Sequence, residues 1–342
     1  IGHNTITNSF ATAKITAGKY AGGLVGLFRS GEIKKCYARA DVTATLSNGY
    51  GAGGLVGVGE YITRVYDSYA MGNISDKSTS TWAIAGGVVG VIHQNSNYVH
   101  RSYFVGTLSA TTTLSTSSST TAHVAGIVGY SNAASCTNQV KDCVSLATSI
   151  TATATRSTNY CQAAQIVSGA QSTSYMITEL NRTGNYALGT VTGKANKQNS
   201  NKGTRVQANV QLESSDKFKA DCTVLLPSWN INGGSVWAHS AEVNEGLPTL
   251  RGLPADNSDL DSLISTARSY NAEDWSVATY SVLMAAADAA EAAVETMTDE
   301  EKVAHMKAIN DAIIGLRPET GELQRLYDDI VTNKLPYKEW FV

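Results

Sequence analysis

The side chains with the clearest chemical use are aromatic, and they recur at one position of successive chain segments. The set is Phe10, Tyr37, Tyr69, Tyr103 and Tyr186. Aromatic rings that pack on one another gain roughly 0.5–1.5 kcal/mol per pair, and an exposed ring also offers a face on which a sugar can stack. Two interpretations stay open: a packed column at a corner or in the core, or a glycan-stacking platform. The platform residues would be Tyr37, Tyr69, Tyr103 and Tyr186.

The sequence carries no motif for hydrolysis, phosphate binding or a metal centre. It has no His-Glu-x-x-His, no Gly-x-Ser-x-Gly and no Gly-Lys-Ser/Thr loop. Its five cysteines (36, 136, 143, 161 and 222) include no Cys-x-x-Cys pair, and Asp256–Asp261 lacks the glycine and terminal glutamate of a calcium loop. Nothing singles out a carboxylate pair for glycoside hydrolysis. We therefore predict no catalytic residue, no cofactor and no metal ion.

Glycine-rich tracts between the aromatic positions show that the chain is built from repeats. The tracts are Ala21–Gly26, Ala52–Gly57, Ala85–Gly90, Val124–Gly129 and Ala163–Ser168. They end at intervals of 31, 33, 39 and 39 residues. Self-similarity at such a period indicates one structural unit stacked on copies of itself. Equivalent side chains, such as Val25, Val56 and Val89, should then lie in columns.

The segments that carry the aromatic residues read as strands. After Cys36-Tyr37, small or aliphatic residues alternate with polar ones, so Ala38, Ala40 and Val42 should share a buried face. Small residues there imply closely spaced layers. We predict a stacked parallel β-solenoid with coils about 4.8 Å apart. Cys36 and Cys143 occupy the same repeat position as Ser68 and are expected to be small buried ladder residues.

These tracts resemble the GLUG repeat of large bacterial surface proteins, over residues 1–192. The resemblance implies a right-handed parallel β-solenoid in an extracellular protein, without catalytic residues. Two runs of Thr, Ser and Ala, at 107–122 and 145–158, account for the longer intervals. We expect polar turns or extra strands there, with O-glycosylation or a threonine-lined binding face as the alternatives.

Residues 193–254 are expected to form an irregular β region that caps the solenoid. The segment holds Trp229, Trp237 and a Gly-Leu-Pro-Thr-Leu stretch at 246–250, which resembles the closing piece after GLUG arrays. Bulky residues and proline suit the exposed end of a stack of strands. A sugar-stacking site at the two tryptophans is the alternative.

Beyond residue 254 the pattern becomes helical, and residues 255–318 are predicted to form a three-helix bundle. The first helix carries Leu260 and Leu263, and the second spans 272–296. Thr298 to Glu301 reads as a capping box that opens the third helix. The inward residues expected on the second helix are Val277, Leu283, Ala286, Ala290 and Val294.

The second helix resembles the core of FIVAR domains, small helical bundles of Gram-positive surface proteins. The match rests on Trp275-Ser276-Val277-Ala278-Thr279-Tyr280 and the residues after it. Residues 319–342 start another helix and are expected to begin a further bundle. Ile1 is not Met, and the first repeat lacks its glycine tract, so we expect a fragment of a longer protein.

The net charge of −3 is split along the chain: residues 1–255 hold 12 acids and 19 bases, and residues 256–342 hold 17 acids and 7 bases. The excess of positive charge in the first part is expected to be ordinary solvated surface, with weak attraction for anionic polymers such as acidic glycans as the alternative. Its density is too low for dedicated nucleic-acid binding. The sequence contains no signal peptide, transmembrane run or lipidation motif. We expect a monomer without direct membrane insertion, and the resemblance implies an extracellular location, secreted or attached to the cell wall.

The sequence therefore favours a non-catalytic segment of a bacterial surface protein. Its role would be adhesion or presentation as a stiff spacer, with host or cell-wall glycans or surface proteins as partners. One alternative is an accessory region of a large secreted peptidase or glycosidase whose catalytic domain lies elsewhere. A further alternative is a solenoid that itself degrades polysaccharide.

Overall fold

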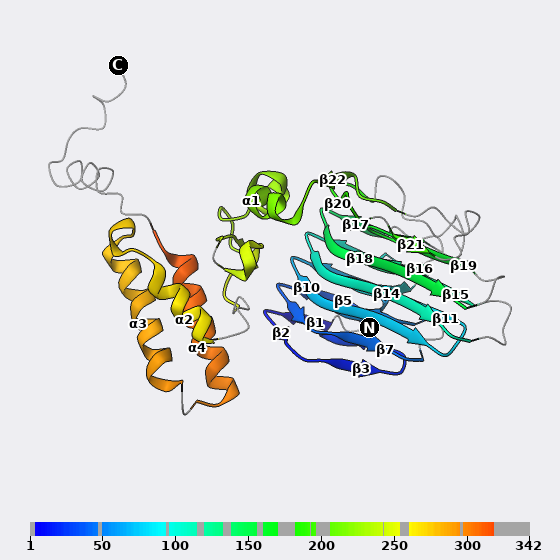
Figure 1. The fold of residues 1–342 in the computed structure, drawn as a ribbon, viewed down its shortest axis with the longest axis horizontal. Coiled ribbons are helices and arrows are strands. Elements are labelled where there is room, and N and C mark those ends of the chain that lie inside the picture. The colour runs from blue at the N-terminus through cyan, green and yellow to red at the C-terminus, as the bar shows by residue number, and fades with distance from the viewer. Residues whose placement is uncertain are drawn as a thin grey trace, which may run out of the picture. The chain divides into compact units, whose positions relative to one another are not determined.

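The computed structural model describes residues 4–46, 50–93, 96–114, 120–132, 138–155, 160–169, 182–191, 193–195, 206–241, 243–253, 260–294 and 297–317. The chain divides into two units, residues 1–238 and 239–342 (Figure 1). The predicted tail at 319–342, the linker at 254–259 and Cys136 lie outside the described residues.

Apart from β23 (Trp237–Ala238), which is described below, the described strands of the first unit form three sheets in which the strands run parallel. One sheet contains β1 (Asn4–Thr7), β5 (Val25–Lys34), β9 (Val56–Tyr66), β12 (Val89–His93), β16 (Val128–Asn132), β13 (Tyr98–His100) and β17 (Gln139–Lys141). A second contains β4 (Ala21–Gly22), β8 (Ala52–Gly53), β11 (Trp82–Gly86), β15 (Thr121–Ala125) and β19 (Tyr160–Ala164).

The third sheet carries the aromatic positions. It contains β2 (Phe10–Ala11), β3 (Ile15–Ala17), β6 (Tyr37–Arg39), β7 (Val42–Ala44), β10 (Tyr69–Ser78), β14 (Tyr103–Thr112), β18 (Val144–Ala154), β20 (Tyr186–Leu188), β21 (Lys194–Ala195) and β22 (Val210–Leu212). Figure 1 shows β10, β14 and β18 lying side by side. The Thr-Ser-Ala runs are partly strand, because β14 and β18 extend to Thr112 and Ala154.

Consecutive repeats lie on one another in register, as the glycine tracts predicted. Val25 pairs with Val56, Val56 with Val89 and Val89 with Val128. Each strand therefore pairs with the equivalent strand of the next repeat, which is the arrangement of a β-helix-like fold. The fold is mainly β with parallel sheets, as expected.

Glycine is required where two coils approach most closely. A Cβ added to Gly53 would lie 1.9 Å from the carbonyl oxygen of Val56 and 2.5 Å from the backbone nitrogen of Gly90. Carbon and oxygen cannot approach to 1.9 Å without a backbone shift. Val56 belongs to the same coil as Gly53 and Gly90 to the next coil, so this glycine is required both by the tight corner within its coil and by the space between the layers.

A one-residue bulge keeps β14 and β18 in register beyond Gly106. The pairing of β14 with β18 shifts between Gly106 and Thr107, so that Gly106 pairs with Ala147 and Thr107 with Ser149. Leu108 then pairs with Ile150 and both are buried. The extra residue, Thr148, is absorbed locally, and the inward pattern resumes after it.

The core of the first unit consists of small and aliphatic residues that point inward from the three sheets. Ala38, Ala40 and Val42 belong to it, with Ala70 and Ile74 of the next repeat, as the alternating pattern predicted. Successive residues of a strand point to opposite faces, so the intervening polar residues face outward.

The segment after β22 contains a helix that the sequence did not predict. Helix α1 spans Ser215–Leu225, and Ser214 caps its N-terminus by accepting a hydrogen bond from the backbone N–H of Lys217. Phe218 and Cys222 are its buried residues. A 3-10 helix follows at Pro227–Trp229, and β23 (Trp237–Ala238) ends the first unit. "Irregular β" was therefore the wrong prediction for 215–225.

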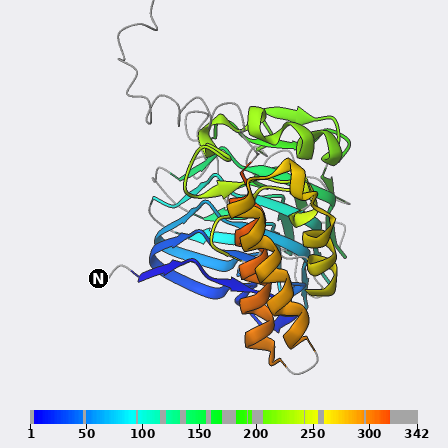
Figure 2. The same cartoon turned by 90° about the vertical axis from the view of Figure 1, so that its left-hand side faces the viewer.

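The second unit holds β24 (Thr249–Leu250), α2 (Leu260–Ser269), α3 (Val277–Ala293) and α4 (Asp299–Gly315), with 3-10 helices at Asn244–Gly246 and Ala272–Asp274. The three α-helices run side by side (Figure 2) and share a core. The leucine and isoleucine side chains buried in this core are Leu260, Leu263, Ile264, Leu283, Ile309, Ile313 and Leu316. None of the described helices is long and apolar enough to cross a membrane.

The capping box at the start of α4 is confirmed, with both of its hydrogen bonds between Thr298 and Glu301 present. The inward face of α3 differs from the prediction. Leu283 and Ala290 are buried, but Val277 is 78% exposed and Val294 is 40% exposed. Helix α3 begins at Val277 and is shorter than the predicted 272–296, so both valines lie at its ends rather than on its packed stripe.

Candidate functional site

The repeated aromatic residues form a stacked column across four coils. The ring centroids of Phe10 and Tyr37 are 5.1 Å apart, those of Tyr37 and Tyr69 4.9 Å, and those of Tyr69 and Tyr103 4.7 Å. The last two pairs are parallel to within 5° and 4°. The predicted column is therefore present from β2 to β14.

Tyr186 lies outside this stack. Tyr103 pairs with Val144 in β18, and Val144 pairs with Tyr186 in β20, so an aliphatic residue separates the two rings. The hydroxyl of Tyr186 donates a hydrogen bond to the carbonyl oxygen of Leu225 at 2.8 Å. Its ring is half-buried beside the end of α1.

The exposure of the column decides between its two interpretations. Tyr37, Tyr69 and Tyr103 are 1%, 0% and 0% exposed. A ring covered on both faces by its neighbours has no face left for a sugar, so burial contradicts a glycan-stacking platform at these three residues. The packed column is the arrangement that the structure contains.

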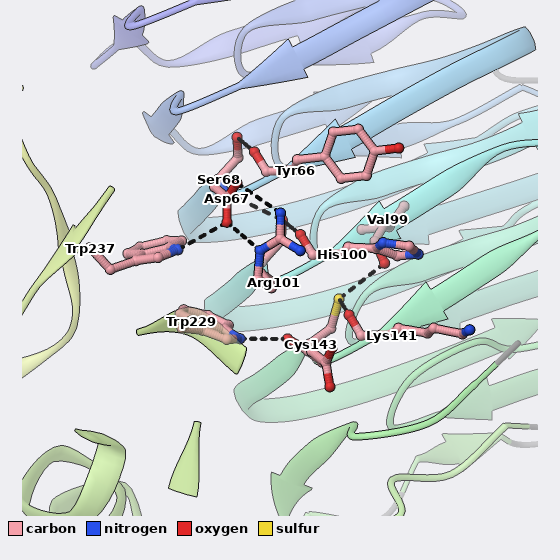
Figure 3. Close-up of polar contacts among 12 residues, drawn as sticks. Tyr66, Asp67, Ser68, Val99, His100, Arg101, Lys141, Cys143, Trp229 and Trp237 are labelled. Carbon is pink, nitrogen blue, oxygen red and sulfur yellow. Dashed lines mark hydrogen bonds and ion pairs between the residues drawn. The ribbon is translucent and has the colours of Figure 1, made fainter. Parts of the chain in front are cut away.

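Two tryptophans, Trp229 and Trp237, cover the column from the side. Figure 3 shows both side chains with the polar contacts of their indole nitrogens. The ring of Trp237 lies 6.5 Å from Tyr69 and 6.0 Å from Tyr103, and the ring of Trp229 lies 6.2 Å from Tyr103. Their own centroids are 4.5 Å apart. Because β10 and β14 are middle strands of their sheet, the prediction that these tryptophans close the end of the solenoid is wrong in its position.

A buried ion pair holds Trp237 in place. Arg101 donates to both carboxylate oxygens of Asp67, from Nε at 2.6 Å and from Nη2 at 3.0 Å. Trp237 donates from its indole nitrogen to Asp67 Oδ1 at 3.2 Å. The side chain of Asp67 is only 4% exposed. Pairing and hydrogen bonding compensate its burial, as a buried charge requires.

The two charged residues sit at the same left-handed turn of successive coils. Asn8, Lys35, Asp67, Arg101 and Asp142 have φ between 44° and 54°. The backbone N–H groups in this column bond to the next coil, as in Asp67 to the carbonyl of His100 at 3.2 Å. The indole nitrogen of Trp229 donates to the carbonyl oxygen of Asp142 at 2.9 Å.

The residue after each turn forms a second ladder. The hydroxyl of Ser68 accepts from the backbone N–H of Cys36 at 3.2 Å, and that of Ser102 accepts from Ser68 at 3.4 Å. Cys36 and Cys143 are buried and form no disulfide, as their repeat position predicted. Burial raises the pKa of the Cys143 thiol to about 12, which leaves it protonated and unreactive.

Two further acids of the solenoid, Asp76 and Asp41, also stabilise local structure. The buried carboxylate of Asp76 accepts from the backbone N–H of Ile84 at 2.7 Å, and Asp41 accepts from the side-chain amide of Asn73 at 2.9 Å. In the part of the chain that the structure describes, no group of three or more His, Cys, Asp or Glu side chains is arranged to hold a metal ion.

A second aromatic group, which the sequence analysis missed, lies apart from the main core. We call Tyr20, Tyr50, Trp82, His123 and Tyr130 the outer aromatic cluster. Tyr20, Tyr50 and Trp82 are half-buried, whereas His123 and Tyr130 are each 2% exposed. A usable signal was the aromatic residue shortly before each of the first three glycine tracts.

Comparison with known proteins gives little beyond this geometry. No family model and no curated protein matches the chain. A crystal structure of a Bacteroides ovatus protein, whose name gives it provisionally as an immunoglobulin A1 protease, is similar over 71% of this chain and 74% of its own. The identity is 16% and the TM-score 0.45, a likeness from which no function follows.

Proposed function

We propose that this chain is a non-catalytic, extracellular segment of a larger bacterial surface protein. In this proposal a right-handed parallel β-solenoid of GLUG type and a FIVAR-like helical bundle act together as a spacer for adhesion or presentation. The observation that carries it is the register of the coils, in which Val25, Val56, Val89 and Val128 form one column.

Register matters because it makes the stack stiff. The backbone N–H of Leu55 bonds to Val88 at 2.9 Å, and that of Val88 bonds to Ile127 at 3.0 Å. Bonds of this kind recur in every described coil, so each coil is held by the backbone of its neighbours. A stiff stack keeps its outer side chains at fixed spacing, which suits a presenting surface.

The use of the polar groups also supports a non-catalytic role. Asp67 is neutralised by Arg101, and Asp76 accepts a backbone N–H. Burial lowers the pKa of His123 to about 3 and raises that of Cys143 to about 12, so neither is poised to exchange a proton near neutral pH. These groups stabilise the coils instead of meeting at a cleft.

The test combines a search for cleavage with a search for adhesion. The purified chain is incubated with casein, immunoglobulin A and a panel of polysaccharides, and new peptides and reducing ends are measured. Beads coated with the chain are then scored for attachment to bacterial cell walls and to epithelial cells. We expect attachment without cleavage. Cleavage of any substrate would show that the chain is catalytic, and absence of attachment to both surfaces would contradict a role in adhesion.

A further inference from the structure

The outer aromatic cluster lies on the side of the sheets that faces away from the main core. Its floor consists of Val58, Ile84, Val91 and Tyr130, all buried, in a group separate from the core. Neighbouring residues of the same strands belong to the core, such as Ala83 beside Ile84 and Ile92 beside Val91. Because successive strand residues point to opposite faces, the floor faces outward.

Two sheets contribute to this floor. Ile84 of β11 pairs with His123 of β15, and Val91 of β12 pairs with Tyr130 of β16. Each pair joins two successive coils. Trp82 connects the two sheets, with its ring 5.7 Å from that of His123 and 5.2 Å from that of Tyr130.

Three half-buried rings lie over this floor. The centroids of Tyr20 and Tyr50 are 4.7 Å apart, and Tyr50 lies 5.8 Å from His93. Tyr20, Tyr50 and Trp82 come from three successive repeats and are half-buried, so each residue keeps some surface that reaches solvent. A run of partly exposed rings over an apolar floor is the arrangement that the buried tyrosine column lacks.

Polar side chains border the rings on one edge. Arg29 pairs with Glu60, and Glu60 pairs with His93, at register positions of β5, β9 and β12. The Arg29 Nε and Glu60 Oε2 atoms are 2.6 Å apart, and the arginine side chain is 62% exposed. Burial, followed by the hydrogen bond with Tyr50 and the charge of Glu60, raises the pKa of Tyr20, so its hydroxyl stays protonated.

The balance of charge argues for an uncharged ligand. The edge offers the paired Arg29 and Glu60 with His93 beside Glu60, and His123, next to the floor residue Ile84, is kept neutral by burial. A phosphate or an acidic polymer at this edge would be repelled by Glu60, and the neighbouring Arg29 is already paired with that carboxylate. Fixed donors and acceptors next to half-buried aromatic rings suit instead a ligand with many hydroxyl groups and apolar C–H faces.

We propose that the outer aromatic cluster binds a neutral carbohydrate chain. Tyr20, Tyr50 and Trp82 stack on its sugar rings, while the Arg29–Glu60 pair exchanges hydrogen bonds with its hydroxyl groups. The proposal rests on the proposed function, since it names the ligand class and the surface through which the spacer adheres.

The experiment measures binding of the whole chain to neutral glycans. A glycan array of bacterial and mammalian neutral structures distinguishes the two sources, and xylan, β-glucan and mannan serve as soluble probes for titration. Heparin and alginate are the anionic probes. We expect the wild type to prefer neutral chains, and Tyr20→Ala and Trp82→Ala each to bind about fivefold to tenfold more weakly.

Matched variants separate binding from folding. Tyr98→Ala removes another half-buried tyrosine, one that packs beneath Arg64 with the guanidinium carbon 5.7 Å from its ring centroid, and is expected to bind as the wild type does. Trp82→Phe keeps an aromatic face and should restore most of the affinity lost in Trp82→Ala. Thermal unfolding of each variant shows whether the fold is intact.

Several outcomes would overturn the proposal. They are no neutral glycan bound at millimolar concentration, a preference for heparin or alginate, and unchanged binding in both alanine variants. Attachment to cells that survives periodate treatment of their glycans but not protease treatment would point to a protein partner instead. If cells still attach to the alanine variants, this site is wrong and the adhesive spacer stands; if the wild type attaches to nothing, the proposed function itself fails.

Discussion

The sharpest mutational test of stacked coils is Gly54→Ala. A Cβ at Gly54 would lie 2.0 Å from the carbonyl oxygen of Gly87 and 2.5 Å from the Cβ of Ala70. Real Cβ atoms stay at least 3.0 Å from such neighbours, so the next coil must move by about 1 Å. Gly54 and Gly87 also donate backbone hydrogen bonds at this place, at 3.1 and 3.0 Å, which the shift would strain.

The expected cost follows from these contacts. Overpacking of a tight interior costs about 1–3 kcal/mol, and each weakened hydrogen bond adds about 1 kcal/mol. We expect Gly54→Ala to lose about 3–5 kcal/mol of unfolding free energy. Gly18→Ala is the matched control, because a Cβ there meets nothing within 4 Å. It should keep stability or raise it by up to about 1 kcal/mol, since alanine meets no neighbour there and restricts the unfolded chain.

Urea unfolding followed by circular dichroism measures both variants, and hydrogen exchange locates the effect. Repeat arrays need not unfold in one step, so exchange of peptides that cover β8, β9, β11 and β12 reports the local loss directly. Equal stability of Gly54→Ala and Gly18→Ala, within about 0.5 kcal/mol, would refute the argument that close packing of adjacent coils selects glycine.

Three further predictions use other contacts. Arg101→Met should cost about 3 kcal/mol in thermal unfolding, because it leaves the buried Asp67 carboxylate without its cation. Arg29→Met removes an exposed partner of Glu60 and should lower the unfolding midpoint much less. Burial lowers the pKa of His123 to about 3 in the folded chain, so between about pH 6.5 and pH 3 only the unfolded chain binds this proton. The contribution of His123 to the unfolding free energy is therefore complete above about pH 6.5 and falls by roughly 1.4 kcal/mol per pH unit below it. In urea titrations at several pH values, His123→Gln should reduce that slope. Thr298→Ala removes the hydroxyl that accepts a hydrogen bond from the backbone N–H of Glu301, while the backbone N–H of residue 298 can still donate to the Glu301 carboxylate. It should cost about 1 kcal/mol, measured as a lower midpoint in the thermal loss of the helical signal at 222 nm.

Most of the solenoid fold could be predicted from the repeat, because residues at equivalent positions of successive repeats become neighbours in space. Val25, Val56 and Val89 occupy one position of the tract and lie in one column. The same reasoning placed Tyr37, Tyr69 and Tyr103 on top of one another. It could not give their exposure, which depends on contacts with a segment far along the chain.

The features that the sequence failed to predict depend on contacts outside the repeat. Trp237 reaches Asp67 across 170 residues, and no periodic signal links the two. Helix α1 carries two buried residues, Phe218 and Cys222, too few for a clear helical stripe. The outer aromatic cluster escaped because Tyr20, Tyr50 and other members precede their tracts by different numbers of residues, so aligning the repeats does not bring them together.

The register of the coils is tested most directly by a pair of engineered cysteines. Thr43 and Ser75 are partners in β7 and β10, with their hydroxyl oxygens 3.0 Å apart. Partners in adjacent strands lie about 4.8 Å apart, within reach of a disulfide, whereas a residue two positions further along lies about 8 Å away, beyond that reach. After mild oxidation and peptide mapping, Thr43→Cys with Ser75→Cys should form the bond, and Thr43→Cys with Lys77→Cys should not. A bond between 43 and 77 but none between 43 and 75 would contradict the stacking on which the structure and the proposed function depend.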